Sequence, residues 1–412
     1  MIRILATADW HLGNCFHGYD RQEEHADYLD WLLQTTVDRE VDALLVCGDV
    51  FDSSNPSAAS QELYYSFLDR LSTCRPGMRT VIIAGNHDSA LRLEAPKALL
   101  LKHNTLVKGV VEKDGDGSVD YGQLLTEVSS KDGERAVVVT VPYLRDGDFV
   151  RGKGYAEGVA TFLTEAVDAA CRVSQDGAVI VMAHLYAKGS EIAADSSERI
   201  VIGGSEMVNV SCLDERVTLL LSGHIHRHQT IGGRDNWLYP GSALPMSFAE
   251  RGYRHGAVCC VIDGGKLASA PEFIEYGLRH PLLSLPDEPA PFNEIRKLLK
   301  KLPKWDGEKD DEGVPYLEVK VLLDTPALPG LNKKIEDLLE GKKVRLCRTA
   351  VSYPVMEVGD EEPHVVSMDD LLSLDPMEII RTRYRKSHGQ EMSDALEGLA
   401  KEAIEAAKRE IG

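Results

Sequence analysis

Five short clusters of polar residues contain the side chains that could do chemistry in this sequence. Each offers carboxylate, amide or imidazole groups, and the glycines at positions 48 and 85 allow a tight turn directly before the polar side chain. In chain order the clusters are Asp9-Trp10-His11, Gly48-Asp49, Gly85-Asn86-His87-Asp88, His184 and Gly223-His224-Ile225-His226. Alternate residues of an extended segment point the same way, so Asp9 and His11 could hold one ion.

Candidate metal ligands dominate these clusters. They are Asp9, His11, Asp49, Asn86, His184, His224 and His226. Mixed nitrogen and oxygen ligation suits Mn, Fe or Zn better than Ca or structural Mg. Seven ligands are too many for one ion. The set therefore predicts two ions about 3.5–4 Å apart, bridged by Asp49, as in hydrolases that clamp the attacking and leaving oxygens of a phosphoester.

Each cluster alone has an ordinary explanation. A single Asp-x-His or Gly-Asp is most often a turn or a surface pair, and a lone histidine such as His184 after an apolar strand is usually a core residue. Five clusters in this order, each just after a strand-like run, indicate a metal site together. We interpret the other nearby histidines as surface residues or as polar residues that support the site; these are His17, His25, His103 and His228.

The elements that must position these clusters alternate along the chain. Short β-branched runs are followed by amphipathic ones, which predicts a layered α/β fold with its ligands at the carboxyl ends of strands. Strands are expected at 2–6, 43–47, 80–84, 136–141, 178–183, 218–221 and 257–262, and helices at 23–37 and 59–71.

A second part of the chain begins near residue 281. The stretch 281–292 is rich in proline and suits a linker. A helix at 293–302, a strand at 316–323, a helix at 331–339 and a strand at 343–349 then predict a small α+β unit. From Ser367 the pattern is helical, with Asp375-Pro376 as a helix start and Gly389 as a break. We therefore expect three parts: 1–280, 281–355 and 364–412.

Composition excludes some classes of protein. A formal charge of −20 argues against a module that coats nucleic acid through general electrostatics, but an enzyme can supply positive charge through bound cations. The eight cysteines are scattered, without Cys-x-x-Cys pairs, and suit reduced thiols. The N-terminus leaves no room for a signal peptide and no apolar run approaches membrane-spanning length, so we expect a soluble cytoplasmic protein with no membrane association.

The clusters resemble the motif set of the calcineurin-like metallophosphoesterases, which implies two stacked sheets flanked by helices. The segments TADWHLG, GDVFD, AGNHDS, GHIHR and YPGSALPMSF are more similar to the SbcD family of nuclease subunits, relatives of the archaeal and eukaryotic break-repair nucleases. Protein phosphatases of the superfamily have Gly-Asp-x-x-Asp-Arg-Gly and Gly-Asn-His-Glu instead. Here Asp52 is followed by two serines, and Asp88 follows His87.

The resemblance also implies roles for individual residues. It gives one ion Asp9, His11, Asp49 and His226, and the other ion Asp49, Asn86, His184 and His224. It leaves His87 free of metal, where an imidazole could donate a proton to the leaving oxygen. Asp88 would either orient His87 by accepting its other N–H or cap a turn. The basic run near the C-terminus is better interpreted as a solvated helix face than as a DNA-binding stripe; it comprises Arg381, Arg383, Arg385 and Lys386.

The function implied by the resemblance is a DNA nuclease with two divalent ions, Mn²⁺ before Mg²⁺. Such enzymes act as exonucleases on duplex ends and as endonucleases on single strands or hairpins, in break processing, recombination and replication. The partner would be an SbcC-type coiled-coil ATPase, in a heterotetramer that contains a homodimer of this chain. The 281–355 unit would recognise DNA, and the terminal helices would dock the ATPase.

Two other functions stay open at this point. A phosphoesterase for small cyclic or nucleotide diesters is disfavoured because it leaves the chain beyond Pro281 unexplained. A non-catalytic scaffold that holds the ATPase is disfavoured because it would not need every ligand together with His87.

Overall fold

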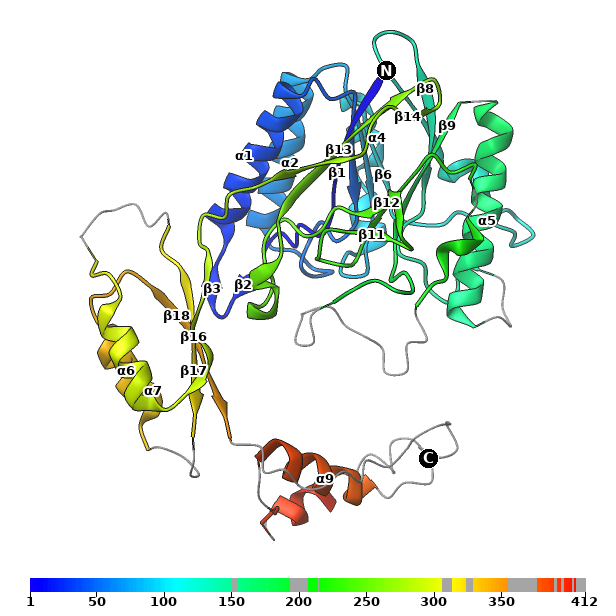
Figure 1. The fold of residues 1–412 in the computed structure, drawn as a ribbon. Helices are drawn as coiled ribbons and strands as arrows, with labels where there is room; N and C mark the ends of the chain where they lie inside the picture. The colour runs from blue at the N-terminus through cyan, green and yellow to red at the C-terminus, as the bar shows by residue number, and fades with distance from the viewer. Residues whose placement is uncertain are drawn as a thin grey trace. The chain divides into compact units, whose positions relative to one another are not determined.

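The computed structural model describes residues 1–149, 154–175, 177–192, 207–213, 215–305, 313–323, 329–353, 376–388, 391–393, 396–401 and 404 of the 412. The chain divides into two compact units, Met1–His280 and Pro281–Gly412 (Figure 1). Each unit has its own hydrophobic core and is described by itself.

Two mixed β-sheets stack face to face in the first unit. The first has the order β14-β13-β1-β4-β5-β6, with β15 paired to β13, and the second has the order β11-β12-β10-β9-β8-β7. The first sheet consists of β1 Ile2–Thr7, β4 Ala43–Cys47, β5 Arg79–Ile83, β6 Thr105–Lys108, β13 Gly256–Asp263, β14 Lys266–Leu267 and β15 Glu272–Glu275. The second consists of β7 Leu125–Ser129, β8 Arg135–Thr140, β9 Ala178–His184, β10 Leu219–Gly223, β11 Gln229–Ile231 and β12 Arg234–Tyr239.

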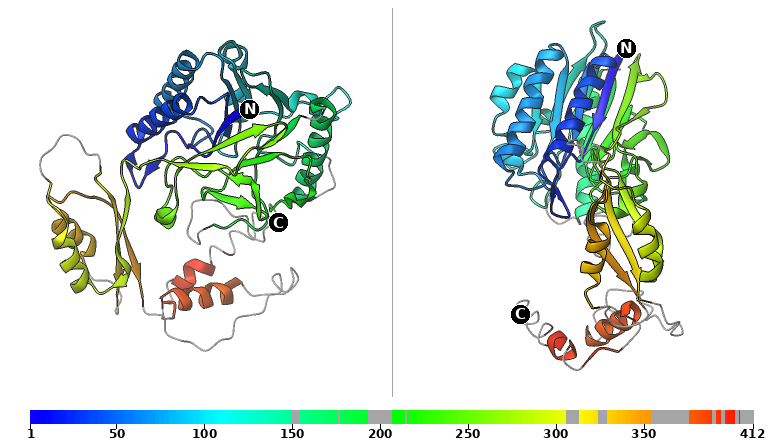
Figure 2. Two further views of the ribbon diagram at one scale, coloured as in Figure 1. Left: turned by 45° about the horizontal axis from the view of Figure 1, so that its top comes forward. Right: turned by 90° about the vertical axis from the view of Figure 1, so that its left-hand side faces the viewer.

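Helices cover the outer faces of this sandwich. The long ones are α1 Gln22–Asp38 and α2 Ala58–Cys74 beside the first sheet, and α5 Tyr155–Ser174 beside the second. Figure 2 shows the strands between the blue helices α1 and α2 and the green helix α5. Shorter elements join the layers: the hairpin β2 Cys15–Phe16 and β3 Tyr19–Asp20, α3 Ala90–Glu94, α4 Lys97–Leu100, η1 Leu101–His103, η2 Tyr121–Leu124, η3 Val210–Cys212 and η4 Phe248–Gly252.

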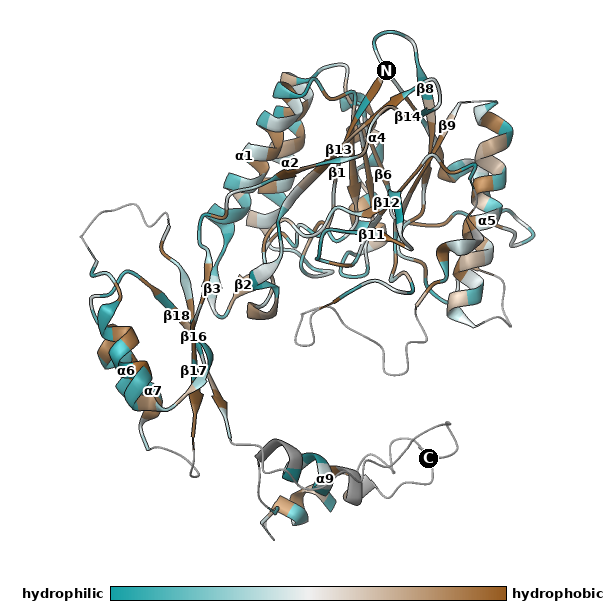
Figure 3. Cartoon of the chain, viewed as in Figure 1, coloured by the Kyte–Doolittle hydropathy of each residue, from teal (hydrophilic) through white to brown (hydrophobic). Residues whose placement is uncertain are grey.

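Side-chain alternation along the strands builds this layered core. In β4, Leu44 and Val46 pack into the cluster that includes α1 and α2, whereas Leu45 and Cys47 pack between the two sheets. Strands buried on both faces consist of near-continuous apolar runs, and Figure 3 shows them as hydrophobic. The double-sheet fold expected from the sequence is confirmed.

The second unit contains a three-stranded parallel sheet with two helices packed on it. Its strands are β16 Leu282–Ala290, β17 Tyr316–Leu322 and β18 Arg345–Ser352, in the order β16-β17-β18. Its helices are α6 Phe292–Lys301 and α7 Leu331–Leu339. Ile295 of α6, Ile335 of α7 and Val319 of the central strand are fully buried in one hydrophobic core.

The prediction of a linker over 281–292 is wrong, because most of that stretch is strand β16. The prolines that suggested a linker, Pro286 and Pro289, lie inside it. β16 is at the edge of the sheet, and its register with β17 shifts between Leu285 and Ala290. Proline is tolerated on edge strands and at such irregularities because its missing N–H is not needed for pairing there.

The C-terminal segment is helical where it is described. Helix α9 spans Pro376–His388, and residues 396–401 are helical as well. Arg381 donates two hydrogen bonds to Glu397, at 2.7 and 2.9 Å, and Arg385 lies 2.7 Å from Glu391. These two arginines of the basic run are therefore paired locally. Ser367, Asp375, Gly389 and the Lys386 side chain lie outside the described residues. Among the described helices, none is long and apolar enough to cross a membrane.

Candidate metal centre

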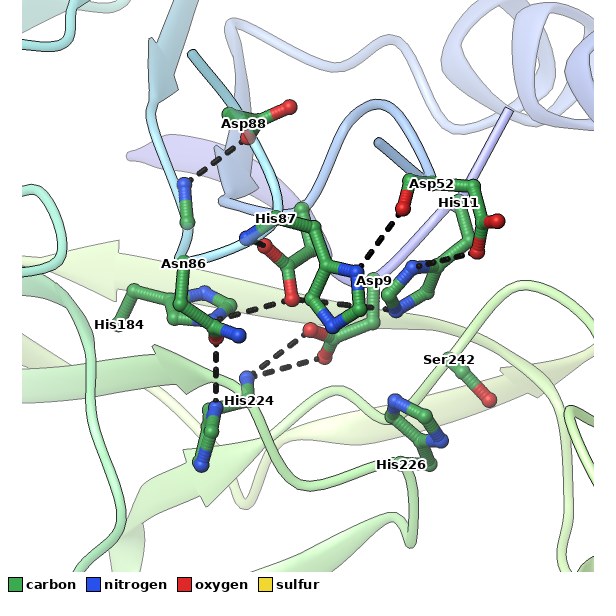
Figure 4. A network of polar contacts seen from close by, with 12 residues as sticks. Asp9, His11, Asp52, Asn86, His87, Asp88, His184, His224, His226 and Ser242 are labelled. Atoms are coloured by element: carbon green, nitrogen blue, oxygen red, sulfur yellow. Dashed lines mark hydrogen bonds and ion pairs between the residues drawn. The ribbon is translucent and has the colours of Figure 1, made fainter. Parts of the chain in front are cut away.

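Strand ends bring the five sequence clusters together. Asp9 follows β1, Asp49 follows β4 and Asn86 follows β5, three strands that pair in parallel in the first sheet. His184 ends β9 and His224 follows β10, which pair in parallel in the second sheet. The carboxyl ends of both sheets therefore meet at one site, where Figure 4 shows the clustered side chains.

The two loops from the first sheet run side by side. The Asp9 N–H donates to the Gly48 carbonyl and the His11 N–H to the Asp49 carbonyl, both at 3.0 Å. Asp9, His11 and Asp49 have φ angles of 50°, 48° and 49°, in the left-handed region. Such a backbone costs about 1–3 kcal/mol per non-glycine residue and is found mainly at functional sites.

Glycine is required where the loops approach each other most closely. A Cβ atom on Gly85 would overlap the Asp49 carboxylate and backbone, and one on Gly223 would overlap the Cys47 carbonyl and approach the His184 ring. The clusters that begin with glycine therefore depend on it for packing.

Asp9, His11 and His226 form the first group of candidate ligands. Their ligand atoms all lie within 4.8 Å of one another, and the three residues are buried. His11 is only 1% exposed, yet within the described part of the chain its Nε2 makes no hydrogen bond and its Nδ1 has only the Asp52 carboxylate, at 3.5 Å. A buried polar atom without a partner costs free energy, so a cation fits this position.

The second group consists of Asn86, His184 and His224. The Asn86 Oδ1 lies 3.0 Å from Nε2 of His184 and 2.9 Å from Nδ1 of His224. Ligand atoms about 2.0–2.1 Å from a shared ion are themselves about 3–3.5 Å apart, so this spacing also fits a cation.

Asp49 lies between the two groups. Its Oδ2 is 3.8 Å from Nε2 of His11 and 3.4 Å from Nε2 of His184. Its Oδ1 accepts a hydrogen bond from the His87 N–H at 2.8 Å. Asp49 and His184 also form a group of possible ligands with Asp9. One carboxylate oxygen thus lies near a histidine of each group.

The protonation of these residues is strongly coupled. Burial lowers the pKa of His224 to about 3, which leaves a neutral ring with a lone pair for a metal. Burial also opposes the charged form of His184, but the Asp49 carboxylate outweighs it and raises the pKa of His184 to about 9. Although burial alone would raise the pKa of Asp49, the His184 and His11 charges bring it well below its ordinary value. A bound cation would take the place of the proton on His184.

His87 lies at the edge of the metal cluster. Its Nδ1 donates to the backbone carbonyl of Asp52 at 2.9 Å, so Nε2 is the ring nitrogen left for a substrate. The ring packs edge-on against the ring of His11, with 4.8 Å between centroids. The side chain is half-buried.

Asp88 does not orient His87, which is one of the two roles expected for it. Its carboxylate accepts hydrogen bonds from the N–H groups of Val50 at 3.1 Å, Phe51 at 2.9 Å and Gly85 at 2.9 Å. Burial and the nearby Asp49 raise the pKa of Asp88 to about 6. These contacts support the turn-capping role, because they join the loops after β4 and β5, and they do not support its assignment as catalytic.

Two carboxylates near the cluster, Glu250 and Asp52, were not predicted as site residues from the sequence. Glu250, on η4, is 0% exposed and its Oε1 lies 3.2 Å from Nδ1 of His226. Burial alone would raise its pKa, but the His226 charge and hydrogen bonds lower it to about 2. Asp52 Oδ1 lies 3.5 Å from Nδ1 of His11. An acid two residues after the end of the motif YPGSALPMSF was the available signal for Glu250.

The four other histidines considered in the sequence analysis lie outside the cluster. His17 and His103 are exposed, and His103 contacts Ser72. His228 is part-buried and donates to the Tyr239 carbonyl at 2.8 Å. His25 is buried, and burial lowers its pKa to about 3.

Family comparisons agree with this arrangement. The calcineurin-like phosphoesterase family model matches residues 2–228, and a model described as the type 5 capsule protein repressor C-terminal domain, SbcD_C, matches residues 279–388. The chain belongs to the calcineurin-like phosphoesterase family, a class of metal-dependent phosphoester hydrolases.

Comparison with curated relatives identifies a more specific family within the calcineurin-like phosphoesterases. The D subunit of the SbcCD nuclease from Rhodobacter capsulatus is 34% identical over 86% of this chain and 88% of the relative. The same protein of Escherichia coli K12 is 29% identical over 84% of both chains, and that of Bacillus subtilis is 33% identical over 66% of this chain and 69% of the relative. The chain thus belongs to the SbcD family of nucleases, and the assignment made from its motifs is confirmed.

Proposed function

We propose that this protein is the nuclease component of an SbcCD-type complex and that it hydrolyses DNA phosphodiesters at a two-metal centre. The position of the Asp49 Oδ2, between the Nε2 atoms of His11 and His184, is the observation that supports this best. One ion would be held by Asp9, His11, Asp49 and His226, and the other by Asp49, Asn86, His184 and His224. Mn²⁺ suits the four imidazoles and the oxygen ligands, and Mg²⁺ is the alternative.

Different residues of the chain would have separate roles in hydrolysis. Two bound cations would neutralise charge on the phosphate and lower the pKa of a water molecule. In its doubly protonated form, His87 would donate the proton on Nε2 to the leaving oxygen, because the Asp52 carbonyl accepts the Nδ1 proton and leaves Nε2 for the substrate. Asp88 would keep the loops in register through its three backbone hydrogen bonds.

The partner of this nuclease would be an SbcC-type coiled-coil ATPase. The relatives are named as subunits of SbcCD, and the C-terminal helical segment has apolar side chains to offer, with Leu396 37% and Leu399 63% exposed. The α+β unit would recognise DNA. These assignments give the parts 1–280, 281–355 and 364–412 separate roles in one complex.

A homodimer would form the centre of that complex. Large apolar side chains are exposed on α2, α3 and α4 of the first unit: Tyr65 is 38%, Leu91 75% and Leu99 65% exposed. An interface with a second copy of the chain would cover such side chains. Light scattering of the full chain and of Leu99→Asp would test this, with a shift from dimer to monomer expected.

Cleavage assays would test the proposed activity against its alternatives. Purified protein, with and without its ATPase, would be incubated in Mn²⁺ with blunt duplex, hairpin DNA and a chromogenic phosphodiester. Cleavage of DNA that responds to the ATPase and ATP supports the proposal. Turnover of only the small diester would favour a small-molecule phosphoesterase, and inactivity on every substrate would favour a scaffold.

A further inference from the structure

The histidines of the metal centre differ in the group that contacts their ring nitrogen Nδ1. Nδ1 of His226 is 3.2 Å from the Glu250 carboxylate, and Nδ1 of His11 is 3.5 Å from the Asp52 carboxylate. Nδ1 of His184 instead donates to the backbone carbonyl of Cys47 at 2.8 Å. The histidines of one group thus have carboxylates behind them, whereas His184 of the other group has a neutral carbonyl.

Glu250 is held firmly in this place. Its side chain is fully buried, its Oε2 accepts the Met246 N–H at 2.9 Å, and the Ser247 hydroxyl lies 3.4 Å from its Oε1. A buried carboxylate is costly unless it is hydrogen-bonded and paired with a positive group. An imidazole that ligates a divalent cation is such a partner, because the cation polarises the ring.

The first group of ligands also carries more negative charge than the second. The first group contains the carboxylate of Asp9, whereas the corresponding oxygen of the second group comes from the neutral amide of Asn86. Asp49 is shared by both groups. A carboxylate behind a histidine fixes its ring and raises its basicity as a ligand. The carboxylate of Asp9 and the carboxylates next to His11 and His226 therefore favour a cation in the first group.

We infer that Glu250 and Asp52 are positioning residues that make the Asp9–His11–His226 position the tighter of two metal positions. This position fills first, and the Asn86–His184–His224 position fills second. This inference rests on the two-metal centre of the proposed function. It adds the order in which the two positions bind metal, and it attributes that order to the two carboxylates.

Calorimetric titration of the metal-free full-length protein with Mn²⁺ tests this directly. The wild type should show two steps of different affinity, and Asn86→Ala should remove the weaker one. Glu250→Gln should weaken the tighter step by about 10–100-fold, the usual effect of losing a residue that supports a metal ligand. It should leave the weaker step in place. The visible spectrum of the first equivalent of Co²⁺ should change in the same variant.

Glu94→Gln is the matched control. Glu94 is also a buried carboxylate, 6% exposed, but it accepts the N–H groups of Gly109 and Val110 and, in the described part of the chain, does not contact the metal cluster. Its metal titration should equal that of the wild type. Asp52→Asn provides a second test that does not depend on the folding of the Glu250 variant, because the Asp52 side chain is 33% exposed. It should weaken the same step, and less strongly, since its contact is longer.

The outcomes separate this inference from the proposed function. If the wild type binds two Mn²⁺ ions with equal affinity, or if both carboxylate variants leave the tighter step unchanged, the inference is overturned and the two-metal centre stands. If the wild type binds no divalent metal, both are overturned.

Discussion

At the scale of single residues, His87 lies at the edge of the metal cluster, with its Nδ1 bonded to the Asp52 carbonyl and its Nε2 left for a substrate. We predict that His87→Ala keeps both metals and loses cleavage by about 10²–10⁴-fold, the usual value of general acid catalysis. Elemental analysis and DNA cleavage rates measure the two effects. His103→Ala, at an exposed histidine, should change neither. Loss of metal from the His87 variant would show that the residue is a ligand.

Asp49 and Asp9 should differ in the number of ions that depend on them. The Asp49 Oδ2 faces a histidine of each group, whereas Asp9 belongs to the first group in our assignment. We therefore predict that Asp49→Ala binds markedly less Mn²⁺ than Asp9→Ala. Equilibrium dialysis gives both stoichiometries, and equal values would contradict the bridging role.

Chelation of the wild type with EDTA should abolish cleavage, and Mn²⁺ should restore it.

His255, which is not a candidate metal ligand, predicts a pH dependence of stability. Burial lowers its pKa to about 4, and it donates from Nδ1 to the Ser242 carbonyl at 3.1 Å. The unfolded chain, with a histidine pKa near 6.5, then binds more protons than the folded chain between about pH 4 and 6.5. The free energy of unfolding should fall as the pH drops through this window, by up to about 3 kcal/mol for this residue. Urea denaturation in EDTA at pH 7.5 and 5 should show a smaller fall for His255→Gln than for the wild type.

At the scale of elements, the sequence predicted strands better than it predicted the contacts between loops. Apolar runs buried on both faces identified the central strands, and polar clusters directly after them identified the metal centre. Proline misled the interpretation of 281–292, because an edge strand tolerates what a central strand does not. Glu250 was missed because its contact with His226 spans 24 residues and depends on how a loop folds back.

The loops after the strands predict a strict requirement for glycine. A Cβ on Gly85 would overlap the Asp49 carboxylate and force the loops apart. We expect Gly85→Ala to lower Mn²⁺ affinity by about 10–100-fold or more, as the loss of supporting contacts does at other metal sites. Gly77→Ala is the control, because no atom of the described residues lies within 4 Å of its added Cβ. Equal affinities in calorimetry would mean that the loops adjust without moving Asp49.

At the scale of the whole molecule, the metal centre and its supporting residues all lie within Met1–His280. That unit has its own hydrophobic clusters, and the α+β unit has a separate one. Among the described residues, the candidate metal ligands therefore all belong to the first unit, and we expect metal binding not to require the C-terminal helices. We expect those helices to bind a partner protein instead.

The C-terminal segment has the features of a docking element. Met377 of α9 is 7% exposed, and Arg381 is bonded to Glu397, so two helical stretches support each other. Leu399 nevertheless stays 63% exposed. An amphipathic helix whose apolar face is not covered by its own chain commonly binds in a groove of a partner protein.

We predict that truncation after Pro363 leaves a folded protein that loads metal and retains Mn²⁺-dependent endonuclease activity on single-stranded DNA. Pro363 lies outside the described residues, beyond the last strand, β18. The truncated chain should no longer co-purify with its SbcC-type ATPase, and ATP should no longer affect cleavage. Leu399→Asp in the full chain should weaken co-purification without changing cleavage of single-stranded DNA. Aggregation of the truncated protein would place the helices in its own core, and undiminished co-purification would place the docking surface elsewhere.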